Sequence, residues 1–262
     1  LDQHGLSGVG TLWENTLHPA RWRVTLHGQQ AFWAHGGAGT MLDHLRALRP
    51  DSRPLQAAAS DHDDVSCGFW QRQGFSRLMR TRSGVLHPGL VPASVMADID
   101  SATQRIIATG YRLVTLTDLG DEESDRRRLA RLHAAIYEQS HQWNPVRALT
   151  DEEACDLFLD PDEVLPESMI IALQGEHLAA VSSLRRREGE AAVDLGWVGV
   201  LPRYAQQQDE LIYSLVGECL HDAASTNRPV MVEVDEANAT LWELMQRLPL
   251  QLKPDWLTFI ER

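Results

Sequence analysis

The stretch that decides the fold is residues 191–224, AAVDLGWVGVLPRYAQQQDELIYSLVGECLHDAA, in which an apolar run leads directly into an amphipathic pattern. The run Ala191–Leu201 is typical of a strand. Residues 206–224 are predicted to form a helix, because apolar side chains recur at the spacing of one helix face: Leu211, Ile212, Leu215, Val216, Cys219, Leu220 and Ala223. Residues 111–262 as a whole show the predicted order β-α-α-β-β-β-α-β-α-β, which indicates the α/β class.

The pattern of residues 191–224 recurs earlier in the chain. At an offset of 171, residues 33–39 align with residues 204–210; at an offset of 175, residues 63–75 align with residues 238–250. A predicted strand precedes the first of these segments in each half, and a predicted helix follows it. Because few residues are identical, the comparison depends on the shared order of elements, which predicts two copies of one module.

Three motifs in these segments resemble those of the GCN5-related N-acetyltransferases. Residues 200–204 (VLPRY) are similar to the family's V-x-P-x-Y, which leads into its acetyl-CoA loop. Residues 238–248 (NATLWELMQRL) resemble a later helix of the family, and residues 69–75 (FWQRQGF) resemble its F-Y-E-K-L-G-F. The resemblance covers nearly all of residues 111–262, but only the later two-thirds of a copy in residues 1–88.

The resemblance implies an acyl-CoA N-acyltransferase fold in two tandem copies, each with a mixed, largely antiparallel central sheet flanked by helices. Residues 1–88 are predicted to be an incomplete N-terminal domain, 89–110 a linker and helix, and 111–262 a C-terminal domain. The resemblance also implies acetyl-CoA as co-substrate and an amine of a small molecule or peptide as acceptor. Because residue 1 is leucine, we expect the chain to begin inside the first copy.

Acetyl-CoA carries a pyrophosphate, an anion that binds well to backbone N–H groups at a helix N-terminus. The second half has Ala205, Gln208 and Glu210 at the positions of the family's R/Q-x-x-G-x-G/A loop, and its acidic side chains are expected to repel the pyrophosphate. The first half keeps both glycines, so the cofactor is predicted to bind there, at His35, Gly36, Gly37, Ala38, Gly39 and Thr40. A glycine-rich turn without a ligand is the alternative interpretation. If the second copy binds, its pantetheine edge is predicted at Val198, Gly199 and Val200.

Candidates for proton transfer are few. Asp194 interrupts the apolar strand run and is predicted to be the base that deprotonates the amine; a solvent-facing strand residue is the alternative interpretation. Glu233 and Asp235 are weaker candidates. The tyrosine that often protonates the CoA thiolate in this family is replaced by Trp70 and Met245. The thiolate is already a good leaving group near neutral pH, so this loss does not exclude catalysis.

Composition argues against several other functions. The net charge of −13, from 24 basic and 37 acidic residues, disfavours binding to nucleic acids or to anionic membranes. Lys253 is the only lysine, which disfavours Schiff-base chemistry. Cysteines and histidines without metal-ligand spacing predict that the protein binds no metal. With no apolar run long enough for a membrane span and no disulfide framework, we expect a reduced, cytoplasmic compartment.

Two classes of function follow. The first is an N-acetyltransferase that uses acetyl-CoA as co-substrate. The second is a catalytically degenerate binding or scaffolding protein, because each half lacks part of the machinery; a binder of another anionic ligand is a third hypothesis. Two copies in one chain also predict a monomer, in which the copies pack as an internal pseudo-dimer.

Overall fold

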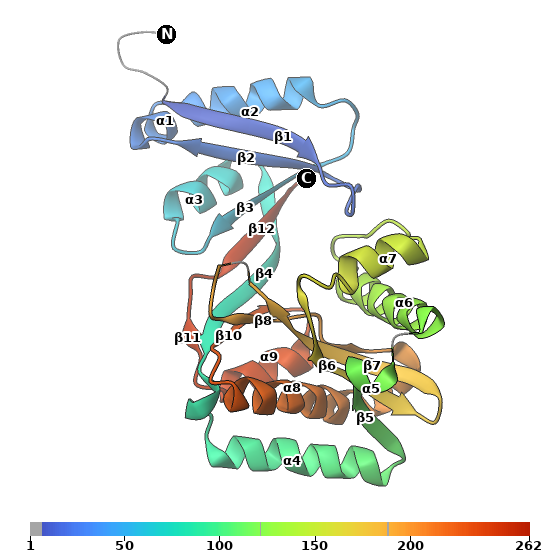
Figure 1. Ribbon diagram of the computed structural model, residues 1–262. Helices are drawn as coiled ribbons and strands as arrows, with labels where there is room; N and C mark the ends of the chain where they lie inside the picture. Colours follow the sequence, from blue (N-terminus) through green and yellow to red (C-terminus); the bar gives the residue numbers. More distant parts are fainter. Residues whose placement is uncertain (1–6, 121, 188) are drawn as a thin grey trace. The chain divides into compact units, whose positions relative to one another are not determined.

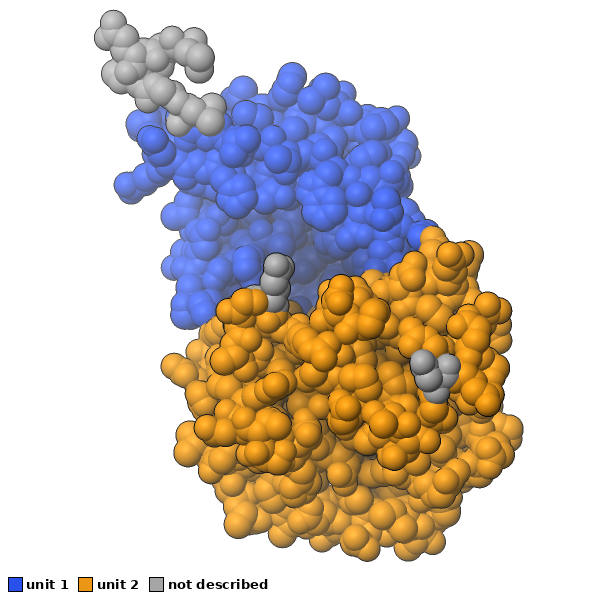
Figure 2. Space-filling view, viewed as in Figure 1, with its two compact units in different colours: residues 1–81, 141–147, 254–262 blue, residues 82–140, 148–253 orange. Residues whose placement is uncertain are grey.

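The computed structural model describes residues 7–120, 122–187 and 189–262 (Figure 1). It divides into two compact units, which Figure 2 colours separately. Unit 1 contains the described residues up to Thr81, with His141–Arg147 and Pro254–Arg262; unit 2 contains Arg82–Ser140 and Ala148–Lys253. Among the described residues, no helix combines the length and the apolar character that crossing a membrane requires.

Unit 1 is built on strands in the order β1-β2-β3-β12-β4. Its core combines alternate side chains of β2 and β3 with buried side chains of α2 and α3. Its elements are β1 (Gly8–Glu14), β2 (Trp22–Gly28), α1 (Gln30–Ala34), α2 (Gly37–Leu48), β3 (Leu55–Ser60), α3 (Asp64–Arg72), the first part of β4 (Phe75–Leu86) and β12 (Trp256–Glu261).

Unit 2 has strands in the order β4-β10-β8-β7-β6-β5, with β9 paired to β7 and β11 paired to β4. Its core surrounds α8, the helix that the amphipathic pattern predicts. Besides two 3-10 helices at Pro88–Leu90 and Pro202–Gln207, its elements are α4 (Ala93–Ala108), β5 (Tyr111–Thr115), α5 (Leu116–Leu119), α6 (Glu123–Ser140), α7 (Asp151–Phe158), β6 (Val164–Gln174), β7 (His177–Arg186), β8 (Val193–Leu195), β9 (Gly199–Val200), α8 (Gln208–Ser225), β10 (Val230–Asp235), α9 (Ala239–Arg247) and β11 (Gln251–Leu252).

The structure confirms the internal repeat at its predicted offsets. In unit 1, β2 and β3 form a parallel pair only at Trp22–Leu55 and Arg23–Gln56. In unit 2, β8 and β10 form a parallel pair only at Val193–Val230 and Asp194–Met231. The first strands of the two pairs are 171 residues apart and the second strands are 175 apart. Beyond these two residue pairs the ladder ends, so both units contain the same divergence of two parallel central strands.

The helices after the diverging strands repeat as well. α3 and α9 each have nine residues and begin 175 positions apart. Asp63 caps α3 by accepting a hydrogen bond from the Ser66 N–H, and Asn238 caps α9 by accepting one from the Leu241 N–H. Both caps supply an acceptor for an N–H group that the helix itself leaves unpaired.

The last strand of the chain belongs to unit 1. β12 lies between β3 and β4 and pairs antiparallel with both. In unit 2, the corresponding place beside β10 is taken by β4, which pairs with β11 at Gly84 and Val85. The two halves of the chain have therefore exchanged a strand. β12, which follows the elements of unit 2 in the sequence, pairs with β3 of unit 1, and β4, which follows the elements of unit 1, pairs with β10 of unit 2.

This exchange divides the chain differently from the predicted domains. Residues 89–110, predicted as a linker and helix, contain α4, which packs in unit 2 so closely that Ile99 occupies the space a side chain would need at Gly217 of α8. Residues 254–262, predicted in the C-terminal domain, belong to unit 1, as do residues 141–147. The first six residues of the predicted N-terminal domain lie outside the described residues.

Polar contacts hold β12 in unit 1 at both ends. Before the strand, Asp255 is almost fully buried and its carboxylate accepts a hydrogen bond from Arg80. The Asp61 N–H donates to the carbonyl of Asp255 at 2.9 Å, and the Asp61 carboxylate accepts a hydrogen bond from the Asp255 N–H at 3.0 Å. At the other end, Glu261 binds Arg46 of α2 at 2.7 Å and Arg49, the residue after α2, at 3.0 Å.

Candidate functional site

The predicted cofactor loop forms a turn between two helices of unit 1. α1 ends at Ala34, Gly36 has a φ of +84°, and α2 begins at Gly37. No side chain caps α2, and its first turn contains no acidic residue. The first N–H groups of α2 thus combine the partial positive charge of a helix N-terminus with the absence of a side-chain acceptor, which suits an anion.

Each of the three positions in this turn is glycine for a different structural reason. Gly36 is in the left-handed region, where glycine carries no penalty. At Gly37 a Cβ would lie 2.9 Å from the ring of Phe32, so packing requires glycine there. At Gly39 the nearest atom to a Cβ would be Nε2 of Gln73, at 4.0 Å. Neither the backbone conformation nor the packing requires glycine at position 39. The space beside this residue, at the first turn of α2, is open, and a ligand could occupy it.

The other three predicted loop residues differ in which of their groups could bind a ligand. Ala38 is buried in the core of unit 1. The backbone N–H of His35 donates to the carbonyl of Ala31, and both the N–H and the hydroxyl of Thr40 donate to the carbonyl of Gly36. The N–H groups of Gly37, Ala38 and Gly39 are therefore the donors of this turn that an anion would use, while His35 and Thr40 shape the turn.

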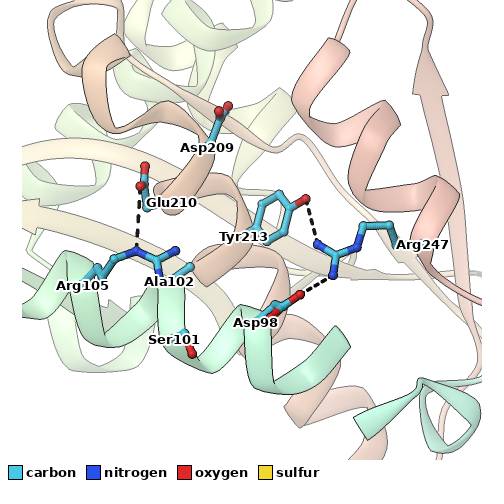
Figure 3. A pocket seen from close by; sticks show the side chains of 8 residues that line it. All are labelled: Asp98, Ser101, Ala102, Arg105, Asp209, Glu210, Tyr213 and Arg247. Carbon is cyan, nitrogen blue, oxygen red and sulfur yellow. Dashed lines mark hydrogen bonds and ion pairs between the residues drawn. The ribbon is translucent and has the colours of Figure 1, made fainter. Parts of the chain in front are cut away.

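The corresponding helix terminus in unit 2 is acidic. Asp209 and Glu210 lie in the first turn of α8, where unit 1 has Ala38 and Gly39. They line a cavity of about 240 Å³ on the surface of α4, α8 and α9, shown in Figure 3 with its other lining residues: Asp98, Ser101, Ala102, Arg105, Tyr213 and Arg247. Carboxylates stabilise a helix start but oppose a second anion there.

Side chains around this cavity are connected to one another. Arg247 binds Asp98 and donates to the Tyr213 hydroxyl at 3.4 Å (Figure 3). Arg105 lies 3.9 Å from Glu210, and the Thr240 hydroxyl donates to Asp209 at 2.6 Å. In unit 2, the side chains beside the start of α8 are thus engaged in ion pairs and hydrogen bonds with one another. This helix terminus is the place where the loop of the resembled family would hold pyrophosphate.

Asp194, the predicted base, lies on β8 in unit 2, opposite Arg185 on β7. Arg187 donates to one of its carboxylate oxygens at 2.7 Å, and this bond raises the pKa of the Arg187 guanidinium. The Asp194 side chain is 39 % exposed, so solvent reaches it. Its position in the repeat is occupied in unit 1 by Arg23. Asp194 and the glycine turn therefore belong to different units.

The predicted pantetheine edge in unit 2 has its side chains in the core. Val198 and Val200 are buried, and Gly199 and Val200 pair with Val181 and Ala180 of β7. A Cβ at Gly199 would lie 2.3 Å from Ile136 of α6. The glycine is thus explained by helix packing, and only the backbone of this edge could contact a ligand.

Sequence reasoning did not single out two buried polar side chains of unit 2, those of His133 on α6 and Arg185 on β7. His133 on α6 is fully buried and stacks on Phe158, with ring centroids 5.4 Å apart. Arg185 is 7 % exposed, binds Glu163 and lies 4.6 Å over the ring of Trp197. Among the described residues, neither ring nitrogen of His133 has a hydrogen-bond partner. His133 fits the apolar stripe of its helix, so no local signal distinguishes it.

His133 should make the protein sensitive to acid. Burial, with a smaller contribution from Arg185, lowers its pKa from 6.5 to about 3. Between these values the unfolded chain binds a proton that the folded chain does not, so the free energy of unfolding should fall by about 1.4 kcal/mol per pH unit as the pH drops. We expect His133→Leu to remove this contribution in urea unfolding between pH 4.5 and 7.5.

His62, whose side chain is 74 % exposed, provides the control for this acid effect. The change in slope caused by His133→Leu should exceed the change caused by His62→Leu, because His133 is fully buried and His62 is exposed. An equal slope in His133→Leu and wild type would show that His133 binds as many protons in the folded chain as in the unfolded chain, and would contradict the interpretation.

Neither the protein-family models nor the curated proteins match this chain by sequence. Solved structures do match. A GCN5-related N-acetyltransferase from Sphaerobacter thermophilus has a TM-score of 0.64 at 12 % identity, over 97 % of this chain and 76 % of that one. A tandem GNAT protein from the clavulanic acid biosynthesis pathway has a TM-score of 0.57 at 17 % identity, over 92 % of this chain and 74 % of that one.

A third match is a glucosamine N-acetyltransferase region in a fungal multi-domain GH3 β-N-acetylglucosaminidase. Its TM-score is 0.64 at 10 % identity, over 97 % of this chain and 31 % of that one. At these identities the likeness establishes the fold and leaves the activity to the site. The chain has the GCN5-related N-acetyltransferase fold, in two tandem copies, and the predicted fold class is confirmed.

Proposed function

We propose that the protein transfers an acyl group from acetyl-CoA to an amine of a small molecule or peptide, and that unit 1 binds the acetyl-CoA. The observation that carries this proposal is the open space at Gly39, beside an uncapped helix terminus without acidic residues. In the same fold position, unit 2 presents Asp209 and Glu210. The contrast favours one acetyl-CoA site per chain.

The residues of unit 1 fit this ligand along its length. The N–H groups of Gly37, Ala38 and Gly39 would hold the pyrophosphate. Beyond Arg23 and Gln56 the ladder between β2 and β3 ends, and the backbone edges there suit the amides of pantetheine, as an added strand would. When bound, acetyl-CoA supplies an activated thioester. Arg23 and Trp70 offer no base and no acid at the expected positions, so the acceptor for this unit is an amine already deprotonated in solvent.

Asp194 remains a candidate base only for a reaction in unit 2, because it lies in that unit and the proposed acetyl-CoA site lies in unit 1. Arg187 engages one of its carboxylate oxygens and solvent reaches the side chain. Because acetyl-CoA is proposed to bind in unit 1 alone, Asp194→Asn is expected to leave both acetyl-CoA binding and turnover unchanged.

The second candidate function is binding without catalysis. It is favoured by Arg23 at the unit 1 position of Asp194, and by Trp70 and Met245 at the positions of the usual acid. A protein of this kind would bind acetyl-CoA in unit 1 and present it, or the folded surface, to a partner.

One experiment distinguishes these functions. The protein is titrated with acetyl-CoA in a calorimeter and then incubated with acetyl-CoA and a panel of primary amines, while release of the CoA thiol and mass of the acylated amine are followed. Saturable binding with amine-dependent thiol release supports the enzyme. Binding without release supports the second candidate, and absence of binding at millimolar acetyl-CoA would overturn both.

A further inference from the structure

Gln56 is a buried side chain whose amide has no partner. It is 1 % exposed, and neither Oε1 nor Nε2 has a hydrogen bond to any described residue. Buried amides are almost always hydrogen-bonded, because leaving their polar atoms unpaired costs free energy. A glutamine in this state is unexpected in a strand whose neighbouring side chains, Leu55 and Ala57, belong to the core of unit 1.

The position of Gln56 in the sheet is informative. It forms, with Arg23, the last residue pair before β2 and β3 diverge. Because side chains alternate along a strand, Gln56 lies on the opposite face of the sheet from Leu55 and Ala57, which belong to the core of unit 1. It therefore stands at the closed end of the divergence, while the glycine turn follows the open end of β2 at Gly28.

A ligand anchored at the glycine turn would extend toward Gln56. From Gly28 to Arg23 the strand advances five residues, about 17 Å at 3.3 Å per residue. In acetyl-CoA the pyrophosphate and the thioester are at opposite ends of the extended pantetheine arm. With the pyrophosphate at Gly39, the thioester is the part of the ligand that faces the closed end.

The internal repeat supplies a comparison for Gln56. Met231 of β10 occupies the same position in unit 2, paired with Asp194. It is 8 % exposed and apolar, as expected for a buried strand residue. The polar residue thus occurs in the unit with the open glycine turn, and the apolar one occurs in the unit with the acidic helix terminus.

We propose that Gln56 is a specificity-determining residue of unit 1, whose side-chain N–H donates to the carbonyl oxygen of the acyl thioester. This inference rests on the proposed binding of acetyl-CoA in unit 1. Gln56 then distinguishes acetyl-CoA from CoA with a free thiol, which has no such oxygen. The unpaired amide is the cost of this selectivity in the protein without ligand.

The test compares Gln56→Met, which installs the unit 2 residue, with Met231→Gln as the matched control. Acetyl-CoA and CoA are titrated into each variant, and thermal unfolding is measured without ligand. We expect Gln56→Met to lose about two- to tenfold in affinity for acetyl-CoA, the effect of one hydrogen bond. Its affinity for CoA should be unchanged, and its melting temperature unchanged or higher. Met231→Gln should leave both affinities unchanged.

Other outcomes overturn the inference in distinguishable ways. An unchanged ratio of the two affinities in Gln56→Met shows that the amide does not contact the acyl group. A lower melting temperature of Gln56→Met shows that the amide already has a partner within the protein. If wild-type protein binds neither ligand, the proposed function fails and the inference fails with it.

Discussion

Phe259→Ala is expected to destabilise unit 1 by about 3–5 kcal/mol, the cost of truncating a fully buried aromatic side chain. Phe259 is 0 % exposed and packs in a core that includes Leu42 of α2 and Phe69 of α3. It lies on β12, the last strand of the chain. Chemical unfolding measures the loss of stability, and hydrogen exchange of residues 37–48 against residues 208–225 shows which unit loses it.

Trp256→Ala provides the matched control for Phe259→Ala. Trp256 is an aromatic residue on the same strand, but it is 50 % exposed, so its truncation removes much less buried area and should cost clearly less. If Phe259→Ala instead accelerates exchange in residues 208–225 and leaves residues 37–48 protected, β12 belongs to unit 2 and the strand exchange is wrong.

Gly39→Glu is expected to weaken acetyl-CoA binding by about five- to thousandfold. Two unit charges 4 Å apart repel by about 1 kcal/mol in water and about 4 kcal/mol at the effective dielectric constant of a protein surface, and these energies convert to that range of affinities. The same substitution should not unfold α2, because a carboxylate in the first helical turn is favourable. Calorimetry and thermal unfolding together should therefore show weaker binding at unchanged or higher stability.

Two further variants control for Gly39→Glu. Glu210→Gly makes the reverse change at the corresponding position of unit 2 and should leave acetyl-CoA binding unchanged. Gly39→Ala adds a methyl group to open space and should have a small effect. Gly37→Glu is unsuitable, because a side chain there meets Phe32. Equal affinity in wild type and Gly39→Glu would contradict binding at this turn.

The repeat could be predicted from the sequence because each of its strands and helices has its own local pattern of apolar and polar residues. The strand before residues 33–39 and the helix after them each follow a local pattern, and both predicted offsets agree with the strand pairing in the structure. The exchange of β12 and β4 could not be predicted in this way. Which strand pairs with β3 depends on distant contacts, such as Asp255 with Arg80, and periodicity contains no information about them.

The candidate site was partly predictable for the same reason. The sequence indicates an anion-binding turn at residues 35–40, but only the packing of Phe32 distinguishes Gly37, which the core requires, from Gly39, which it does not. Likewise, the motif places Gly199 on a strand edge, while Ile136 of α6 explains why it is glycine. Gln56 has no sequence motif at all, and its unpaired amide is visible only when burial and hydrogen bonds are known.

Hydrogen exchange with and without acetyl-CoA tests the central claim, that unit 1 alone binds the ligand. We expect acetyl-CoA to protect amides in residues 36–42, at the first turns of α2, and in the diverging parts of β2 and β3. Residues 202–213, at the start of α8, should exchange at the same rate with and without the ligand. Protection of residues 202–213, or of neither segment at saturating acetyl-CoA, would contradict the account.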